Sequence, residues 1–147
     1  MLAYKYYQNS GFYDFISRDE ISDNHWKQIN KLIRRLYNEE DVDYEARLLR
    51  AFFDFGYRIL ILTDKLDNIL GLCLYKDDYL MNCGQIIHID TLVVCEEGKG
   101  YGKQLINYFD GSYIQLECPI PNEDAQAFYE SKGFKQRAYS YVRRKEG

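Results

Sequence analysis

The sequence has few of the residues from which metal and redox sites are built. Among its 147 residues are only two histidines, His25 and His88, which lie far apart in the chain. Its four cysteines are spaced too widely for a C-x-x-C metal or redox motif; they are Cys73, Cys83, Cys95 and Cys118. A structural zinc site therefore lacks candidate ligands, and we expect no bound metal and four free thiols, as is usual in the reducing cytoplasm.

Long apolar runs and a strong charge of one sign are also absent. No apolar run approaches the roughly 18 residues that a transmembrane helix requires, and the first residues lack the apolar core of a signal peptide. The chain has 23 acidic and 19 basic residues, a net charge of −4. This balance gives no general support for a nucleic-acid or anionic-membrane partner. We expect a cytoplasmic protein that binds neither nucleic acid nor membrane; a homodimer is compatible with the sequence.

Proline is rare, and nothing in the sequence marks a linker. The two prolines, Pro119 and Pro121, fall together, and we find no internal repeat and no low-complexity tract. Apolar residues make up 46% and charged residues 29% of the chain, which argues against a disordered protein. A chain of this length buries roughly 70% of its unfolded surface on folding. We therefore expect one domain spanning residues 1–147.

Helical periodicity is clear in the first part of the chain, after an extended start around residues 12–18. Ser22 is a candidate N-cap for a first helix. Its apolar positions recur at helical spacing and are Trp26, Ile29, Ile33 and Leu36. A second helix is expected from about Asp43 to Phe55, with Gly56 as its C-terminal stop. Its apolar side carries Tyr44, Leu48, Ala51, Phe52 and Phe55.

From Tyr57 onward the period changes to that of β-strands. Residues 57–80 predict an antiparallel hairpin joined near Asp67 and Asn68. Residues 85–95 are almost continuously apolar, which favours an interior strand covered on both faces. An amphipathic helix over residues 103–109 follows, and then a strand over residues 112–118. A strand, a helix and a second strand form a βαβ unit, so these two strands should be parallel.

The last part of the chain predicts one more helix and one more strand. Asn122 can cap a helix that Gly133 can end. Residues 134–145 alternate well enough to form a final strand. Together the elements predict an α+β (α/β three-layer) fold, with a mixed, largely antiparallel central sheet and helices on both faces.

A glycine-rich segment, EGKGYG at residues 97–102, follows the strand of residues 85–95 and opens a helix. Alternating glycines free a row of backbone N–H groups to face one point, which makes an anion site suited to a phosphate. The same glycines are equally compatible with a tight strand-to-helix turn. The segment is not a Walker-A loop, because Lys103 is followed by Gln104, and its spacing differs from the G-x-G-x-x-G of dinucleotide-binding folds.

A second segment, NEDAQAFYESKGF at residues 122–134, has an equally regular pattern. On a helix its Ala125, Phe128 and Tyr129 face the same way. A strand ending in LVV, a loop with G-x-G-x-G, a further strand and then N-x-x-A-x-x-F-Y-x-x-x-G-F resembles the GNAT N-acetyltransferase superfamily. The resemblance extends from Tyr57 to the end of the chain, and the two expected amino-terminal helices take the place of that family's first helix pair.

The resemblance implies that acetyl-CoA is the co-substrate. In the family the glycine loop holds the pyrophosphate, and the pantetheine arm lies where the strands before and after the loop splay apart. Main-chain groups of Leu92 and Val94 would then bind the pantetheine arm, and Asn122 would lie beside the cofactor. The pyrophosphate donors would be the amides of Gly98, Lys99, Gly100, Tyr101 and Gly102.

The resemblance also implies roles in acetyl transfer to a primary amine. Tyr129 corresponds to the tyrosine that protonates the departing CoA thiolate in many members, as a phenol with a pKa of about 10 can do. Side-chain alternation puts His88, Asp90 and Leu92 on one strand face, where several members carry a histidine or glutamate. His88 is the expected base, Asp90 would orient it or bind the ammonium, and Glu117 is a weaker candidate. Packing roles for these side chains remain the alternative.

One departure from the family pattern concerns the glycine loop. Glu97 stands where members usually carry Arg or Gln, and the stretch before Gly98 is shorter than the common pattern. These features favour the second hypothesis, a non-catalytic module of the same fold that binds CoA or another phosphorylated ligand. A purely structural interaction protein would leave the glycine loop unexplained.

Two groups of acidic residues flank the first helix; they are Asp19, Glu20 and Asp23, and Glu39, Glu40, Asp41 and Asp43. In the family such helices often border the acceptor site, which would favour a cationic small amine or a peptide amine as acceptor. The stronger interpretation is that these residues are solvated helix caps and helix ends.

Overall fold

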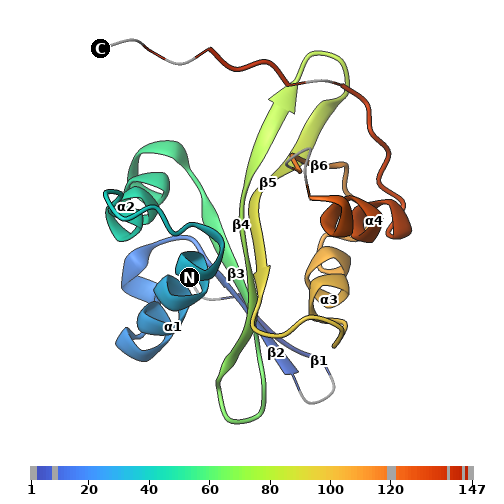
Figure 1. The fold of residues 1–147 in the computed structure, drawn as a ribbon. Helices are drawn as coiled ribbons and strands as arrows, with labels where there is room; N and C mark the ends of the chain where they lie inside the picture. Colours follow the sequence, from blue (N-terminus) through green and yellow to red (C-terminus); the bar gives the residue numbers. More distant parts are fainter. Residues whose placement is uncertain (1–2, 8–9, 119–121, 139, 144, 146–147) are drawn as a thin grey trace. The chain divides into compact units, whose positions relative to one another are not determined.

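Residues 1–117 contain a six-stranded sheet in the computed structural model of the chain (Figure 1). The strands are β1 (Ala3–Tyr7), β2 (Ser10–Phe15), β3 (Arg58–Thr63), β4 (Ile69–Leu80), β5 (Gly84–Val94) and β6 (Ile114–Leu116). They lie side by side in chain order, and all neighbours are antiparallel except the parallel pair β5 and β6. The structure describes residues 3–7, 10–118, 122–138, 140–143 and 145.

Helices cover both faces of this sheet (Figure 1). Helices α1 (Asp23–Leu36) and α2 (Tyr44–Phe55) lie on one face, and α3 (Tyr101–Asn107) lies on the other. A short 3-10 helix, η1 (Arg18–Glu20), precedes α1. This is the three-layer, mixed-sheet fold that the sequence predicts. The parallel strands on either side of α3 confirm the expected βαβ unit.

The ends of α1 and α2 are where the sequence predicts them. The hydroxyl of Ser22 accepts a hydrogen bond from the amide of His25, and the carboxylate of Asp43 accepts one from the amide of Ala46. Both side chains satisfy a backbone N–H that the first turn of a helix leaves without an acceptor. Helix α2 ends at Gly56, whose φ of 69° is unfavourable for a residue with a side chain.

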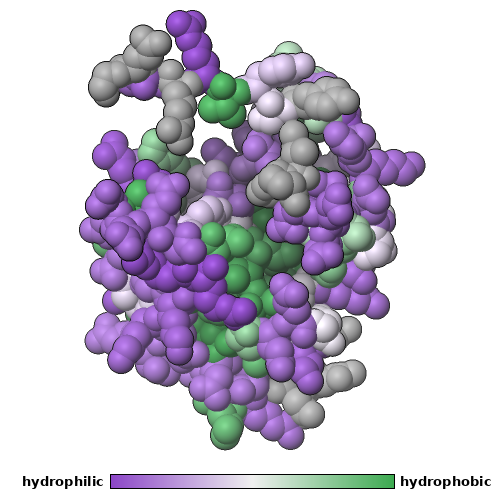
Figure 2. All heavy atoms as spheres, viewed as in Figure 1, coloured by the Kyte–Doolittle hydropathy of each residue, from purple (hydrophilic) through white to green (hydrophobic). Residues whose placement is uncertain are grey.

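Each of these helices buries an apolar stripe against the sheet. Burial of one large apolar side chain contributes about 1.5–3 kcal/mol to folding. In both helices the buried stripe stops one turn before the end of the helix. The last residues, Leu36 of α1 and Phe55 of α2, are 48% and 58% exposed. Figure 2 shows apolar side chains gathered over the middle of the sheet, bordered by hydrophilic side chains on the α1–α2 side. The buried positions of the two helices are His25, Trp26, Ile29, Leu32, Ile33, Tyr44, Leu48 and Phe52.

A buried carboxylate organises the other face of the sheet. Asp14, which is 4% exposed, accepts hydrogen bonds from the hydroxyls of Tyr75 (2.6 Å) and Tyr108 (3.2 Å). The guanidinium of Arg58 lies 3.1 Å from the same carboxylate and forms an ion pair with it. Burial raises the pKa of Tyr75, and burial with the charge of Asp14 raises the pKa of Tyr108 to about 12. The cluster ties β2, β3 and β4 to the residue that follows α3.

Residues 118–147 form a second compact unit. Its helix α4 (Glu123–Ser131) begins at Asn122, whose side chain accepts a hydrogen bond from the amide of Ala125. Gly133, with a φ of 87°, follows the helix as the sequence predicts. The final strand expected over residues 134–145 is wrong for the residues that the structure describes there, which lie in no strand. Alternation alone does not make a strand, because a neighbouring strand must accept its hydrogen bonds.

Three further observations concern the described part of the chain. No helix among the described residues is long and apolar enough to cross a membrane. None of the four cysteines forms a disulfide within this part of the chain; Cys73 is buried in the sheet and Cys95 is exposed. Over the same residues, no three histidine, cysteine, aspartate or glutamate side chains come together as a metal site would require.

Candidate functional site

A β-bulge interrupts β5 at Asp90. Tyr75 of β4 pairs with Ile89, whereas the preceding residue, Leu74, pairs with Thr91, so Asp90 is an extra residue without a counterpart on β4. A bulge of this kind bends the strand and breaks its regular side-chain alternation. Bulges are frequent next to active sites, because they redirect side chains there.

The bulge changes which side chains share a face. His88 lies opposite Lys76, and Thr91 lies opposite Leu74, which packs in the core beneath α1 and α2. Leu92 lies opposite Cys73 and therefore points to the α3 side. The sequence-based placement of Leu92 on the face of His88 and Asp90 is wrong, because simple alternation takes no account of the extra residue.

The bulge also changes which edge of β5 its backbone groups point to. Before the bulge, the amide of Ile87 donates to the carbonyl of Tyr113, on the β6 side, at 2.7 Å. After the bulge, the amide of Cys95 donates to the carbonyl of Leu70, on the β4 side, at 2.8 Å. Hydrogen-bonding direction alternates along a strand. The backbone groups of Leu92 and Val94 therefore point away from β4, on the side where β6 lies.

Among the residues that the structure describes, no strand pairs with that edge of β5 beyond Ile89. Pairing of β5 with β6 ends at Ile89 and Leu116 among the described residues. The carbonyl of Val94 accepts a hydrogen bond at 2.8 Å from Arg35 of α1, which leaves the amides of Leu92 and Val94 directed at the unpaired side. An extended ligand can bind such an edge through main-chain hydrogen bonds.

The glycine loop between β5 and α3 is exposed throughout residues 95–100. Gly98 has a φ of 79° and Gly100 a φ of 81°, both in the left-handed region. A Cβ added to either glycine would meet no atom within 4 Å, so there is room for a side chain. Glycine is favoured there because its backbone readily adopts a positive φ. The amides of residues 98–100 donate to no acceptor within the described chain, and those of the first turn of α3 are unpaired by geometry. Such amides suit an anion.

A chain of hydrogen bonds fixes the carboxylate of Asp90. The hydroxyl of Thr91 donates to Oδ2 of Asp90 at 2.8 Å, and the hydroxyl of Tyr37 lies 3.1 Å from Oγ1 of Thr91. The Thr91 hydroxyl has a single hydrogen, which it donates in the hydrogen bond to Asp90. Tyr37 is therefore the donor in the hydrogen bond to Thr91. Oδ1 of Asp90 has no partner in the described chain, so it can accept a hydrogen bond from a ligand.

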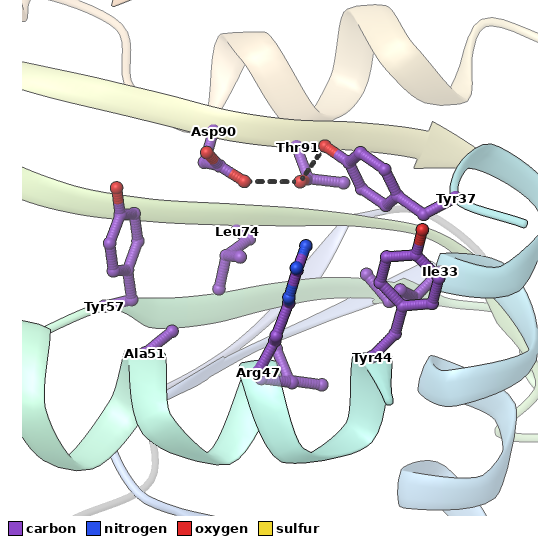
Figure 3. A pocket seen from close by; sticks show the side chains of 10 residues that line it. Ile33, Tyr37, Tyr44, Arg47, Ala51, Tyr57, Leu74, Asp90 and Thr91 are labelled. Atoms are coloured by element: carbon purple, nitrogen blue, oxygen red, sulfur yellow. Dashed lines mark hydrogen bonds between the residues drawn. The ribbon is translucent and has the colours of Figure 1, made fainter. Parts of the chain in front are cut away.

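Asp90 and Thr91 line a pocket of about 320 Å³ between the sheet and helices α1 and α2 (Figure 3). Its volume is in the range of pockets that hold small molecules. Three tyrosines form much of its wall, and Arg47 extends from α2 into it. The residues that line the pocket are Ile33, Tyr37, Tyr44, Arg47, Leu48, Ala51, Tyr57, Leu74, Asp90 and Thr91.

The two tyrosines on either side of Asp90 stay protonated over a wide pH range. Burial raises the pKa of Tyr37 from its usual value, and the charge of Asp90 raises it further. Burial also raises the pKa of Tyr57, together with the charges of Asp90 and Asp78. Both phenols are therefore hydrogen-bond donors at neutral pH, and neither acts as a base there.

The two further residues expected in the site, Asn122 and Tyr129, belong to the second unit. The side-chain oxygen of Asn122 caps α4. The ring of Tyr129 is half-buried and contacts Phe128 and Phe134 edge-on, with ring centroids 5.4 Å and 5.7 Å away. Glu97 and Glu117 are exposed.

The acidic residues that flank α1 serve the helix ends. The carboxylate of Glu20 accepts hydrogen bonds from the amides of Ile16 and Ser17, and Asp23 forms an ion pair with Arg18. None of the acidic residues of residues 19–23 and 39–43 lines the pocket described above. The stronger of the two sequence interpretations is confirmed for Glu20, Asp23 and the N-cap Asp43.

The sequence predicts only part of the pocket. Helical periodicity places Ile33, Tyr44, Leu48 and Ala51 on the buried sides of their helices, but no pattern singles out Tyr37, Arg47, Tyr57 or Thr91. Their residue types are ordinary, and they come from four places: the residue after α1, helix α2, the residue before β3, and β5. The one signal in the sequence is that Arg47 follows Tyr44 by three residues and so shares its helix face.

Comparisons with solved structures support the fold. A possible acetyltransferase from Clostridium difficile 630 has a TM-score of 0.72 at 15% identity, over 95% of this chain and 99% of its own. A ribosomal-protein-alanine N-acetyltransferase from Brucella melitensis biovar Abortus 2308 has a TM-score of 0.71 at 18% identity, over 93% of this chain and 99% of its own. The aminoglycoside N-acetyltransferase AAC(6')-Iy in complex with CoA has a TM-score of 0.70 at 15% identity, over 94% of this chain and 95% of its own. At these identities the likeness is one of fold.

No curated protein gives a significant match to the sequence. The sequence profile of the acetyltransferase (GNAT) family, however, matches residues 26–134, which include most of α1 and all of the bulged strand, the glycine loop and α4. Since the profile spans most of the chain and the fold agrees with it, the chain belongs to the acetyltransferase (GNAT) family.

Proposed function

We propose that this chain is an acetyl-CoA-dependent N-acetyltransferase that acetylates the primary amine of a small molecule by direct transfer in a ternary complex. The observation that carries the proposal is the bulge of β5. On one side of it an unpaired strand edge presents the amides of Leu92 and Val94, and on the other Asp90 opens into a pocket. Both substrates of an acetyl transfer can therefore reach the same short stretch of β5.

The chain's own groups fit acetyl-CoA as co-substrate. The exposed amides of residues 98–102 suit the pyrophosphate, because both Gly98 and Gly100 adopt the left-handed conformation that turns successive N–H groups outward. The strand-edge amides of Leu92 and Val94 suit the amide groups of the pantetheine arm. In this proposal Asn122 lies beside the bound cofactor.

The chemistry assigns one task to each polar residue. Asp90 accepts a hydrogen bond from the acceptor's ammonium, and His88, on the same face of β5, takes the proton that the amine must lose before it attacks the thioester carbon. The amide of Leu92 donates to the carbonyl oxygen as it gains charge. As the new C–N bond forms and the C–S bond breaks, Tyr129 donates a proton to the departing thiolate.

The acceptor is proposed to be a small molecule. Known structures of similar fold include aminoglycoside acetyltransferases, one of them in complex with sisomicin. A pocket of about 320 Å³ that is bordered by a carboxylate and phenols suits an amine that is cationic in solution. The free thiols fit a reducing compartment, and we place the reaction in the cytoplasm.

A non-catalytic module that binds CoA is the second candidate. Glu97 favours it, because a carboxylate next to the phosphate-binding amides opposes the charge of the ligand. The polar residues at the bulge favour catalysis, because binding of CoA alone needs no acceptor pocket.

An acceptor screen tests the proposed function. The protein is incubated with acetyl-CoA and each of a panel of primary amines, thiol release is followed, and the product mass is measured. We expect thiol release to depend on the amine and to match formation of the acetamide. Binding of acetyl-CoA without transfer to any amine would favour the non-catalytic module.

A further inference from the structure

The pocket carries a positive charge as well as a negative one. Arg47 extends into it from α2 (Figure 3) and forms no ion pair within the described chain. Its guanidinium lies 5.8 Å from the centre of the Tyr44 ring. Asp90, the carboxylate of the pocket, is held by Thr91 and keeps Oδ1 available. The pocket therefore offers one site for a cation and another for an anion.

Further cations stand near the pocket. The guanidinium of Arg34 lies 5.5 Å from the Tyr44 ring, and the ammonium of Lys76 lies 5.1 Å from the Tyr57 ring. Acidic groups lie there too: the charges of Asp90 and Asp78 act on Tyr57, and Asp43 caps α2 directly before Tyr44. An acceptor that carries only positive charges would leave the guanidinium of Arg47 without a counter-charge.

From these charges we infer that the acceptor is a primary amine that also carries a carboxylate on a compact apolar body, as an apolar amino acid does. This inference rests on the proposed function and names its substrate class. The ammonium binds the carboxylate of Asp90, and the substrate's carboxylate binds the guanidinium of Arg47, a geometry in which arginine forms two parallel hydrogen bonds.

The walls between the two charged groups suit an apolar body. Tyr37 and Tyr44 stack with ring centroids 5.6 Å apart, and Leu74 forms the floor on β4. Contact between these side chains and an apolar ligand removes apolar surface from water, which favours binding. Selectivity then comes from the paired charges, because a neutral analogue leaves the Arg47 guanidinium without a counter-charge.

Binding to the CoA-saturated protein tests this inference without requiring turnover. The probes for calorimetric titration are L-phenylalanine, L-methionine and L-leucine, each beside its carboxamide, with spermine as a polycation. We expect each amino acid to bind at least 10-fold more tightly than its carboxamide, and spermine to bind weakest.

Two arginine variants locate the effect. Arg47→Gln should weaken binding of the amino acids about 10-fold and leave binding of the carboxamides unchanged, so that the preference for the carboxylate is lost. Arg50→Gln is the matched control, because Arg50 lies one turn further along α2, pairs with Asp54 at 3.1 Å and does not line the pocket. Arg50→Gln should keep the wild-type preference.

Turnover measured with the same probes separates the two proposals. If the amino acids bind in the Arg47-dependent way but no amine is acetylated, the proposed function fails and the pocket remains a binding site for amino acids. If amines are acetylated but the carboxamides react as well as the amino acids, or Arg47→Gln changes nothing, the inference is overturned and the proposed function stands. Absence of binding by every amino acid also overturns the inference.

Discussion

The role proposed for Tyr129 depends on its hydroxyl and not on the packing of its ring. Tyr129→Phe keeps the edge-on contacts with Phe128 and Phe134. We expect kcat to fall about 10²-fold, because a general acid contributes a factor of that order, while the Kd for acetyl-CoA stays the same. Steady-state kinetics and calorimetry give the two quantities.

Tyr141→Phe is the control for this substitution, because Tyr141 is 91% exposed and has no assigned role. It should leave kcat unchanged. A Tyr129→Phe enzyme with the wild-type kcat would show that the thiolate takes its proton from another donor, such as water.

Glu97 gives a second prediction at the scale of one residue. Glu97 directly precedes the amides proposed to bind pyrophosphate, and at about 8 Å the repulsion between like charges is roughly 0.5–2 kcal/mol. Glu97→Gln should therefore tighten CoA binding a few-fold at low ionic strength, and the gain should shrink as salt is added. Calorimetric titration at two salt concentrations measures the effect.

A pantetheine compound that lacks the pyrophosphate is the control for Glu97, because it brings no charge to be repelled. It should bind the wild type and Glu97→Gln equally. If CoA itself binds both proteins equally at low salt, the carboxylate points away from the loop, and the main argument for a non-catalytic module is lost.

At the scale of elements, α1 fixes the end of β5 through one side chain. Nη1 of Arg35 donates to the carbonyls of Val94 and Cys95, at 2.8 Å and 2.5 Å, just before the glycine loop. Arg35→Met should loosen this junction and raise the Kd for CoA about 3–10-fold, which corresponds to the roughly 1 kcal/mol of a typical hydrogen bond.

Lys31→Met is the matched control for Arg35→Met, because Lys31 is an exposed residue one turn earlier on α1. It removes the same charge and leaves the carbonyls of β5 bonded. If the two variants bind CoA equally, the end of β5 does not depend on α1 for its position.

The elements also show how far sequence reasoning extends. The caps at Ser22 and Asn122 and the stop at Gly56 depend on neighbouring residues alone, and each lies where the sequence predicts it. The bulge at Asp90 depends on how β5 pairs with β4, which no local pattern in either strand reveals. For the same reason local patterns give candidate residues for the site, but not the face of Leu92 and not the pocket into which Arg47 extends.

At the scale of the whole molecule, the cluster around Asp14 predicts how stability depends on pH. The folded protein holds the pKa of Tyr108 at about 12, and that of Tyr75 is also raised, whereas an unfolded tyrosine titrates near 10.0. Above pH 10 the unfolded chain therefore loses protons that the folded chain keeps. The free energy of unfolding should be unaffected by these groups below pH 10 and should fall as pH rises toward 12.

Urea unfolding at pH 9, 10 and 11 measures this fall. Tyr108→Phe removes one of the titrating groups and should flatten the pH dependence, although it also lowers stability at neutral pH. Tyr79→Phe, at a tyrosine that is 71% exposed, should leave the dependence as it is in the wild type. Equal slopes in all three proteins would contradict the role of the Asp14 cluster.

The most direct test of the central claim is whether acetyl-CoA stabilises the folded chain through the edge of β5 and the glycine loop. Thermal and urea unfolding are measured with and without acetyl-CoA. At a ligand concentration 100 times the Kd, the free energy of unfolding should rise by about 2.7 kcal/mol. CoA alone should also stabilise the protein. Unfolding that is unchanged by millimolar acetyl-CoA and by CoA would contradict the account.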